Sequence, residues 1–248
     1  MKSMSIRTMN TSHWRQPIVS SDKIEALTEE ELKNGVLRNS GYRFYKEEDF
    51  DVFVKYLMEN WNLGYKKAKI SHRLAAEIYA HFTLSESQIM IVDKFKTSGF
   101  ASYQCALITE ESECQVYHKA QFEKLISAYP SIKPYYEAES KIENFQKQKS
   151  NNYLQILIVG KKYQGQNIGK TLFEFIRNIE YQLWFKNQNH DKANLLQELS
   201  VYTTTDCNVS FYERLKGKLV YEESSIPDGD IPAKAMIFRF PVLNYSWE

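Results

Sequence analysis

Hydrophobic residues recur at helical spacing in several segments of this sequence, and this period predicts amphipathic helices. Before residue 41 the chain is polar and irregular, with one helix expected from Asp22 to about Gly35 that carries Ile24, Leu27, Leu32 and Val36 on its apolar side. Acidic residues at 47–49 suit the first turn of a helix that follows them. Further helices are expected over about 49–61, after Lys69, and over 119–128, 134–147, 168–184 and 208–216.

Between these helices lie segments with the pattern of β-strands. The segments 88–92 and 99–108 read as a hairpin, because a turn-like stretch separates them. Tyr153 to Val159 is almost continuously apolar, which is typical of a strand buried on both faces in the middle of a sheet. Other strands are expected at 42–45, 199–203, 218–221 and 234–242. The order of elements predicts an α/β (α+β) fold in which helices flank a central sheet.

Two segments fall outside this pattern. Residues 1–40 are expected to be an N-terminal extension, and 41–248 a single domain. Within that domain the charged segment at about 109–150 is broken by Pro130 and Pro134, and we expect it to be a helical insertion. It either shapes an acceptor pocket, with Tyr129, Tyr135 and Tyr136 available to line it, or is a packed surface elaboration.

Composition limits the partners of the protein. The 43% of apolar residues in 248 is ample for a packed core, and a formal net charge of +1 gives no overall field toward nucleic acid or an anionic membrane. No apolar run approaches the roughly 20 residues that span a bilayer, and Met1 to Ser20 lacks the apolar stretch of a signal peptide. We therefore expect a cytoplasmic protein without nucleic-acid or membrane partners, either a monomer or a homodimer.

The cysteines and histidines predict neither a disulfide framework nor a metal site. The three cysteines form no CxxC pair, and their number is odd. The five histidines show no HExxH or similar spacing. These residues are Cys105, Cys114, Cys207, His13, His72, His81, His118 and His190.

Candidate chemistry lies in the loop between the buried strand 153–159 and the helix that follows it. Where a glycine-containing turn opens a helix, free backbone N–H groups converge on one point, and the helix dipole adds partial positive charge there. Gly165 and Gly169 supply backbone freedom, and Asn167 tolerates a positive φ better than most residues. The predicted phosphate-binding residues are Gln164, Gly165, Gln166, Asn167, Ile168, Gly169, Lys170 and Thr171.

Two classes of phosphate-binding protein compete for this loop. Residues 164–171 nearly match the P-loop pattern GxxxxGK[ST], but Gln164 replaces its first glycine. The strand that ends at Asp206 passes through three threonines instead of the apolar run expected before a magnesium-binding aspartate. Too little chain follows Thr171 for a nucleotide hydrolase. A P-loop nucleotide-binding protein is thus the weaker hypothesis.

The same loop resembles the Q/R-x-x-G-x-G/A motif of the GNAT superfamily of N-acetyltransferases, after a strand and at the start of a long helix. Downstream, the segment from Thr204 to Leu215 resembles the second signature of that family, with Asn208 followed by Phe211 and Tyr212. The resemblance extends over residues 41–248 and is strongest over 153–223. It implies a GNAT fold, with a central mixed and mostly antiparallel sheet that splays apart between the strands near 153–159 and 199–203.

The resemblance also implies a reaction. Acetyl-coenzyme A would be the cosubstrate, without a metal, and its acetyl group would pass to a primary amine by direct attack. Main-chain groups of Leu157, Ile158 and Val159 would bind the pantetheine arm, with Asn208 as a further partner or as a helix N-cap. Tyr212 would protonate the departing thiolate.

The sequence departs from the family in ways that leave alternatives open. Asn167 stands where the family has its central glycine, and Gly217-Lys218 where it usually has Gly-Phe. No catalytic carboxylate is present on the central strand, because Gln155 is the only polar residue between Tyr153 and Val159. The general base is therefore unassigned, and a non-catalytic sensor or scaffold that binds acetyl-coenzyme A is the alternative to an enzyme.

Overall fold

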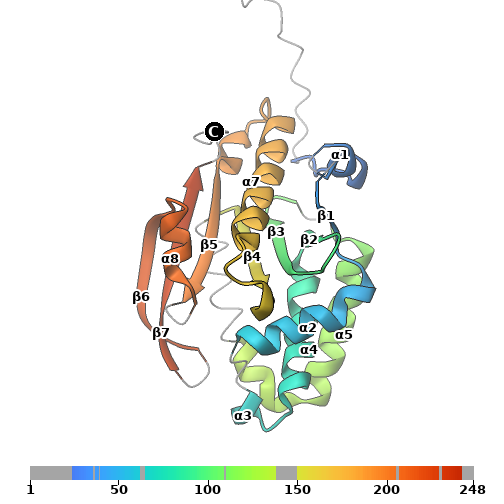
Figure 1. Cartoon of the computed structure of the whole chain (residues 1–248), viewed down its shortest axis with the longest axis vertical. Coiled ribbons are helices and arrows are strands. Elements are labelled where there is room, and N and C mark those ends of the chain that lie inside the picture. Colours follow the sequence, from blue (N-terminus) through green and yellow to red (C-terminus); the bar gives the residue numbers. More distant parts are fainter. Residues whose placement is uncertain are drawn as a thin grey trace, which may run out of the picture.

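The computed structural model describes residues 24–35, 37–38, 40–61, 65–108, 110–137, 150–204, 207–228 and 231–241. Its centre is one mixed sheet (Figure 1). The strands are β1 (Tyr42–Phe44), β2 (Ile89–Asp93), β3 (Gly99–Cys105), β4 (Asn152–Val159), β5 (Glu198–Thr204), β6 (Lys218–Asp228) and β7 (Ile231–Pro241). Their spatial order is β1-β2-β3-β4-β5-β7-β6. All neighbouring pairs are antiparallel except β4 and β5, which confirms the expected mixed and mostly antiparallel sheet.

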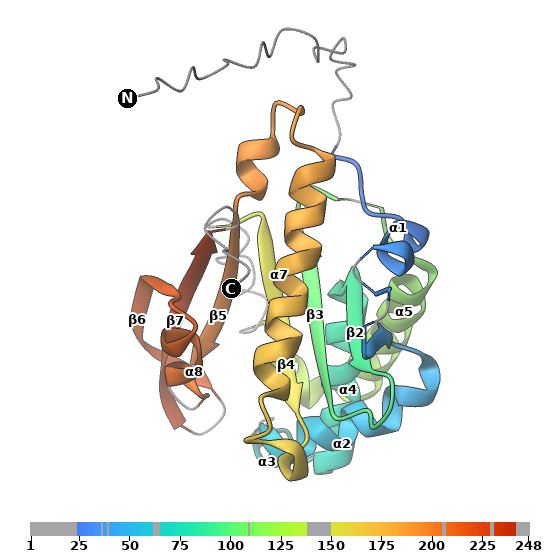
Figure 2. The same cartoon turned by 45° about the horizontal axis from the view of Figure 1, so that its top comes forward.

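Helices cover both faces of this sheet (Figures 1 and 2). The α-helices are α1 (Glu29–Asn34), α2 (Phe50–Asn60), α3 (Tyr65–Ala68), α4 (His72–Glu86), α5 (Glu113–Ala128), α7 (Ile168–Lys186) and α8 (Val209–Arg214). Short 3₁₀ turns are η1 (Glu47–Asp49), η2 (Pro130–Ile132), η3 (Lys161–Tyr163) and η4 (Ala193–Leu196). Among the described helices, none is both long and apolar enough to cross a lipid bilayer.

Each face of the sheet has its own hydrophobic core, because successive strand residues point to opposite sides. On one face α7 buries Leu172, Phe173 and Ile176 against residues that include Ala101 and Phe238. The other face packs against α2 and α4. There the buried residues include Phe53, Leu57, Ile78, Phe82, Phe100, Ile156 and Ile158.

The expected splay between β4 and β5 is confirmed. The two strands pair only from Asn152 to Leu154, opposite Leu199 to Val201. β4 then continues to Val159 paired with β3, whereas β5 stays paired with β7. At the divergence Gln155 is the extra residue of a β-bulge, since Leu154 faces Tyr103 and Ile156 faces Ser102. Bulges bend a strand and end its pairing, so this one directs the second half of β4 away from β5.

The segment before residue 41 is packed onto the domain where it is described. Ile24, Leu32 and Leu37 are buried in the core beneath α7. Asn187 at the end of α7 accepts a hydrogen bond from Glu25 N at 2.9 Å and donates one to Glu25 O at 3.0 Å. The first 23 residues, and Val36 of the expected helix, lie outside the described residues.

The expected insertion adds a helix to the α2/α4 layer. α5 begins at Glu113, six residues before the predicted start, because Ser112 and Gln115 form a capping box. It packs against α4, with the rings of Phe82 and Phe122 5.3 Å apart. Tyr136 is 5% exposed and packs against both rings. Most of the helix predicted at 134–147 lies outside the described residues.

A buried acid of α7 makes the stability of the fold depend on pH. Glu180 is fully buried, neither of its carboxylate oxygens has a hydrogen-bond partner in the described chain, and Arg177 Nε lies 3.8 Å away. Burial raises the pKa of Glu180 well above its ordinary value. The carboxyl is therefore protonated in the folded protein at pH values where the unfolded chain ionises it. That contribution to stability is complete below about pH 4.5 and is lost as the pH rises.

We expect Glu180→Gln to become more stable relative to the natural chain as the pH rises. The amide cannot ionise, so its advantage should grow by about 1 kcal/mol or more between pH 4 and pH 8. Urea denaturation of both proteins at these two pH values measures it. An advantage that stays constant with pH would contradict the assignment of a neutral Glu180.

Candidate functional site

The loop after β4 has the conformation of a glycine-rich turn that opens a long helix. Gly165 has φ = 78°, and Asn167, the residue before α7, has φ = 61° and ψ = 6°. Both values lie in the left-handed region, which glycine and asparagine adopt at least cost. Asn167 thus adopts the left-handed conformation that was expected of a glycine at this position. Its side chain makes no capping hydrogen bond.

Asn167 gives a direct test of this local strain. Asn167→Gly should leave the free energy of unfolding within about 0.5 kcal/mol of the natural chain, because glycine also accepts a positive φ. Asn167→Val should lower it by about 1–2 kcal/mol, since a β-branched residue is strained there. Chemical denaturation of the three proteins provides the comparison. Equal stability of the valine and glycine variants would contradict a left-handed residue 167.

Backbone N–H groups gather without partners where the loop meets α7. Within the described residues, none of the N–H groups from Gly165 to Lys170 donates a hydrogen bond to a protein acceptor. The first intrahelical bond is that of Thr171 N to Asn167 O, at 3.0 Å. These residues are exposed or half-buried, so the donors face solvent at the positive end of a helix of 19 residues. Such an arrangement binds anions.

Neither the backbone conformation nor the packing of the protein requires a glycine at position 169. A Cβ at this position would lie 3.6 Å from Val159 Cγ2 and 3.7 Å from the ring of Phe211, which are ordinary contacts. Its φ is helical, and glycine in a helix costs about 1 kcal/mol relative to alanine. Val159 ends β4 and Phe211 belongs to α8, so the missing Cβ leaves room at the mouth of the gap between β4 and β5. Room of this kind allows a ligand to approach the backbone.

Polar contacts hold the loop against the end of α2. The amide nitrogen of Gln164 donates to Asn60 Oδ1 at 2.8 Å and to Val159 O at 3.3 Å. Lys161 N donates to Glu59 Oε2 at 3.0 Å. Gln164 therefore supports the loop, and the Val159 carbonyl is already engaged.

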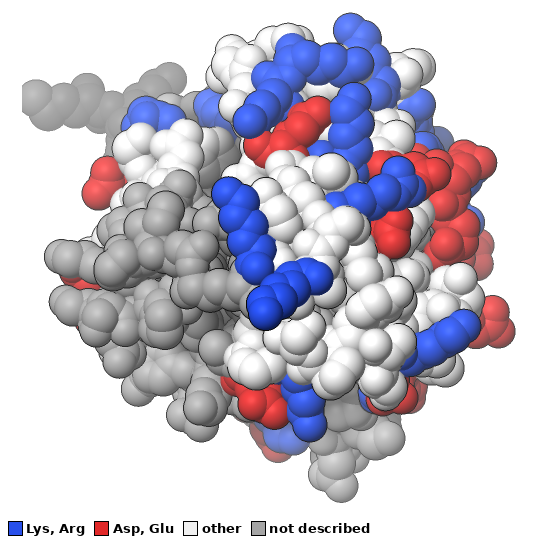
Figure 3. All heavy atoms as spheres, turned by 90° about the horizontal axis from the view of Figure 1, so that it is seen from below, with Lys and Arg blue, Asp and Glu red and all other residues white. Residues whose placement is uncertain are grey.

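Three lysines lie on or just before the loop of free donors. Lys161, Lys162 and Lys170 are exposed, and Lys170 Nζ lies 3.6 Å from Glu174 Oε1. Thr171 Oγ1 donates to Asn167 O at 3.1 Å, which occupies its hydrogen within the helix. Figure 3 looks onto the lower end of the molecule, where an uncharged area is bordered by Lys and Arg side chains and, in several places, by Asp and Glu side chains. The charge complements an anion without dominating the surface.

The predicted catalytic residue lies in α8, among aromatic rings. Tyr212 is half-buried, its ring centroid 5.2 Å from that of Phe211 and 5.9 Å from that of Phe238. Burial, with a smaller contribution from Cys207, raises the pKa of the Tyr212 phenol. The phenol is therefore protonated at neutral pH, as a proton donor must be.

Asn208 occupies the N-cap position of α8, but its side chain caps no backbone N–H. Its Oδ1 accepts instead from Ser210 Oγ at 2.9 Å, and the residue is exposed. Asn208 therefore lies at the position of a helix cap without acting as one, and its role as a partner of the pantetheine arm stays a prediction. Asp206, on which the P-loop hypothesis depends, lies outside the described residues.

The strand β4 carries no carboxylate toward the gap. Gln155 Oε1 accepts from Ser87 Oγ at 2.9 Å and from Ser102 Oγ at 3.2 Å, so the bulge side chain is held on the α4 side of the sheet. This arrangement fixes the point of splay and supplies no base. The general base stays unassigned.

Comparison with known proteins gives structural neighbours only. No protein-family model and no curated protein matches the sequence. In structure the chain is similar to several solved acetyltransferases. An N-acetyltransferase from Staphylococcus aureus Mu50 has 11% identity and a TM-score of 0.44, over 81% of this chain and 97% of that one. The ribosomal-protein-S18-alanine N-acetyltransferase from Escherichia coli has 13% identity and a TM-score of 0.43, over 83% and 96%.

A protein of Streptococcus mutans UA159, smu.2055, has 12% identity and a TM-score of 0.48, over 82% of this chain and 99% of that one. At such identities and scores the neighbours do not establish an activity for this chain. The surroundings of the loop bear on the P-loop hypothesis more directly. P-loop folds place that loop in a buried parallel sheet, whereas among the strands that the structure describes only β4 and β5 run parallel.

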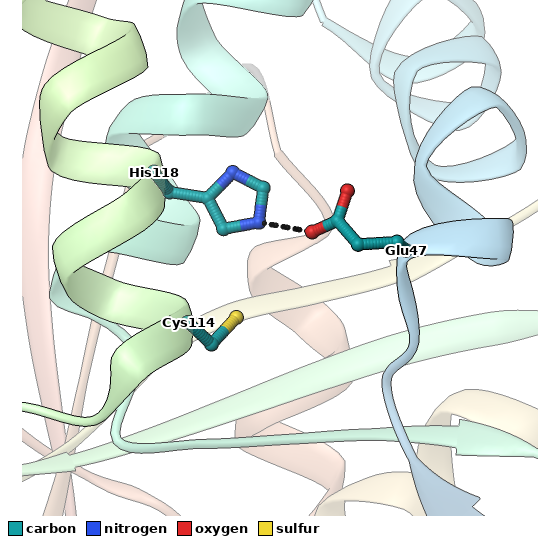
Figure 4. Close-up of side chains that lie close together, drawn as sticks. All are labelled: Glu47, Cys114 and His118. Carbon is teal, nitrogen blue, oxygen red and sulfur yellow. Dashed lines mark ion pairs between the residues drawn. The ribbon is translucent and has the colours of Figure 1, made fainter.

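A second group of functional side chains lies on the α2/α4/α5 side, and the sequence did not predict it. Glu47 of η1 and Cys114 and His118 of α5 converge, and each offers a ligand atom within 4.8 Å of the others (Figure 4). His118 Nδ1 lies 2.8 Å from His81 Nδ1 of α4. The one signal in the sequence is the four-residue spacing of Cys114 and His118, which places both on one face of a helix.

Proposed function

We propose that this protein is an N-acetyltransferase that transfers the acetyl group of acetyl-coenzyme A to a primary amine. The observation that carries the proposal is the parallel pair β4 and β5, which separates after Leu154 and leads directly into a loop of free backbone donors. The gap between the two strands can bind an extended chain through backbone hydrogen bonds, and the loop at the end of the gap can bind phosphates. Coenzyme A has both parts.

The residues present fit this cosubstrate. The N–H groups of 165–170 and the dipole of α7 bind the pyrophosphate, and Gly169 lets it come close to the helix. Lys161, Lys162 and Lys170 add positive charge around it. Gln164 holds the loop in place through Asn60.

The edge of β4 binds the pantetheine arm. Beyond Leu154 the main-chain groups of Leu157 face the β5 side and have no strand to pair with, so they bond to the amides of an extended ligand as a further strand would. Ile158, which was also expected to bind the arm, directs its main-chain groups to Phe100 of β3, because Gly160 N two residues later bonds to Ser98 O on that side. Acetyl-coenzyme A supplies the acetyl group as a reactive thioester. An N–H of this edge would stabilise the negative charge that develops on the thioester oxygen, because a fixed donor stabilises that charge more than it stabilises the ground state.

Tyr212 completes the proposed reaction from α8. Its protonated phenol gives a proton to the departing sulfur, and the aromatic packing around it fixes the ring. The attacking amine must be neutral, so its proton leaves through water or a base on the acceptor side. Asn208 is the candidate partner of the pantetheine arm at the start of α8.

Release of free thiol tests the activity. Purified full-length protein is incubated with acetyl-coenzyme A and a panel of primary amines, which includes small amines, a polyamine and peptides with a free N-terminus or lysine. The proposal predicts thiol release that depends on one class of amine. Binding of acetyl-coenzyme A without turnover on any amine would favour the sensor or scaffold instead.

A further inference from the structure

The side chains of Glu47, Cys114 and His118 form a cluster that the acetyl-transfer chemistry does not use. We propose that this cluster is a zinc site, with those three residues as ligands and a water in the fourth position. Their donor atoms are a carboxylate oxygen, a thiol sulfur and an imidazole nitrogen, the set that Zn²⁺ binds in proteins. The inference is independent of the proposed transferase activity.

The spacing of the three donor atoms suits a tetrahedral ion. They all lie within 4.8 Å of one another, and His118 Nε2 is 2.9 Å from Glu47 Oε1. A tetrahedral Zn²⁺ with normal bond lengths separates such ligand atoms by about 3.3–3.6 Å. Cys114 and Glu47 are exposed, so small rotations of these two side chains bring all three atoms to bonding distance. Figure 4 shows the three pointing toward one another from η1 and α5.

The buried nitrogen of His118 indicates that the cluster takes a ligand. The side chain of His118 is fully buried, yet within the described residues its Nε2 makes no hydrogen bond of acceptable geometry, even to the nearby Glu47. A buried polar atom without a partner is costly unless something else binds it. The hydroxyl of Tyr45 also has no hydrogen-bond partner within the described residues, and the Tyr45 ring centroid lies 6.2 Å from that of His118. Two unsatisfied polar atoms thus adjoin one group of metal-binding residues.

The neighbours of His118 orient its ring for binding a cation. Its Nδ1 lies 2.8 Å from His81 Nδ1. In the tautomer in which His118 Nδ1–H donates to His81, the lone pair of His118 Nε2 is free to bind a cation beside Glu47 and Cys114. Phe50 stacks on the His118 ring at 6.0 Å and 11°, which fixes the plane of the imidazole. Binding displaces the proton of the Cys114 thiol, which passes to solvent as the Zn–S bond forms.

The site would join two parts of the fold. Glu47 precedes α2, and Cys114 and His118 lie on the first two turns of α5, the helix of the expected insertion. A metal bound to all three would fasten that helix to the start of the domain. Zinc at 100 times its Kd should then raise the Tm by about 5–10 °C.

Metal titration of the full-length protein tests the proposal. The protein is treated with EDTA, desalted under reducing conditions and titrated with Co²⁺, then with Zn²⁺ against a chromogenic chelator. We expect one equivalent of each ion, a thiolate-to-cobalt charge-transfer band and the visible spectrum of tetrahedral Co²⁺. Cys114→Ser should remove the band and weaken Zn²⁺ binding more than tenfold. Because Cys114 is exposed, this variant should fold, which circular dichroism checks.

Two further variants separate this site from adventitious binding. Cys207→Ser, the matched cysteine control, should keep the band and the affinity. His81→Phe should keep the charge-transfer band but weaken Zn²⁺ about 10- to 100-fold, because His81 orients a ligand without being one. Absence of stoichiometric binding by the natural chain, or unchanged binding by Cys114→Ser, would overturn the proposal.

Discussion

Gly169→Glu is expected to weaken the binding of coenzyme A and acetyl-coenzyme A at least 100-fold while the protein stays folded. The new carboxylate would stand between Val159 and Phe211, at the entrance to the gap and beside the donors proposed to bind the pyrophosphate. Like charges in a shared site repel, and the side chain fills the room that the glycine leaves. Stability should not fall, because a Cβ meets only ordinary contacts here and an acidic residue in the first turn suits the helix dipole. Isothermal titration measures the affinity.

Gly41→Glu is the matched control for this variant. Gly41 lies just before β1, and a Cβ there meets no atom within 4 Å. The control adds the same charge and size away from the loop, so it should bind coenzyme A like the natural chain. Equal affinities of the two glutamate variants would show that the phosphates do not bind at the start of α7.

Tyr212→Phe is expected to lower kcat by about 100-fold and to leave the KM for acetyl-coenzyme A nearly unchanged. Phenylalanine keeps the ring contacts with Phe211 and Phe238, so only the hydroxyl is lost. General acid catalysis contributes about 10²–10⁴-fold to rates of this kind. The measurement is the steady-state rate of thiol release with the best amine of the panel.

Tyr181→Phe provides the comparison for the loss of a phenol. Tyr181 is exposed on α7 and stacks with Phe185, away from α8. Its variant should turn over like the natural chain. If Tyr212→Phe also turns over normally, the proton reaches the thiolate from another donor and the role of Tyr212 is wrong.

Much of the fold follows from local pattern. The apolar run Tyr153 to Val159 predicted a central strand, and β4 lies between β3 and β5. The glycines and Asn167 predicted the turn into α7, since few residues accept a positive φ. By contrast β6 extends seven residues beyond its predicted end at Tyr221. This longer strand includes Pro227, which has no N–H to donate and is tolerated because β6 lies at the edge of the sheet.

The candidate functional residues could be predicted from the sequence less evenly than the fold. The loop proposed to bind phosphate is contiguous, so a local sequence pattern is enough to single out its residues. The cluster of Glu47, Cys114 and His118 was missed, because Glu47 is far from α5 in the chain and approaches it only through the packing of α2, α4 and α5. For Gln155 the sequence prediction was correct and the structure adds the reason. Sequence indicated that β4 lacks a carboxylate, and the structure adds that Ser87 and Ser102 hold this side chain away from the gap.

The central claim is that the gap between β4 and β5, with the loop at its end, binds coenzyme A. Thermal unfolding of the full-length protein with coenzyme A, acetyl-coenzyme A, or ATP and Mg²⁺ tests it most directly. The account predicts that coenzyme A and acetyl-coenzyme A raise the Tm of the natural chain and of Gly41→Glu, but not that of Gly169→Glu. Stabilisation by ATP with Mg²⁺, and none by coenzyme A, would contradict it and favour a nucleotide-binding loop.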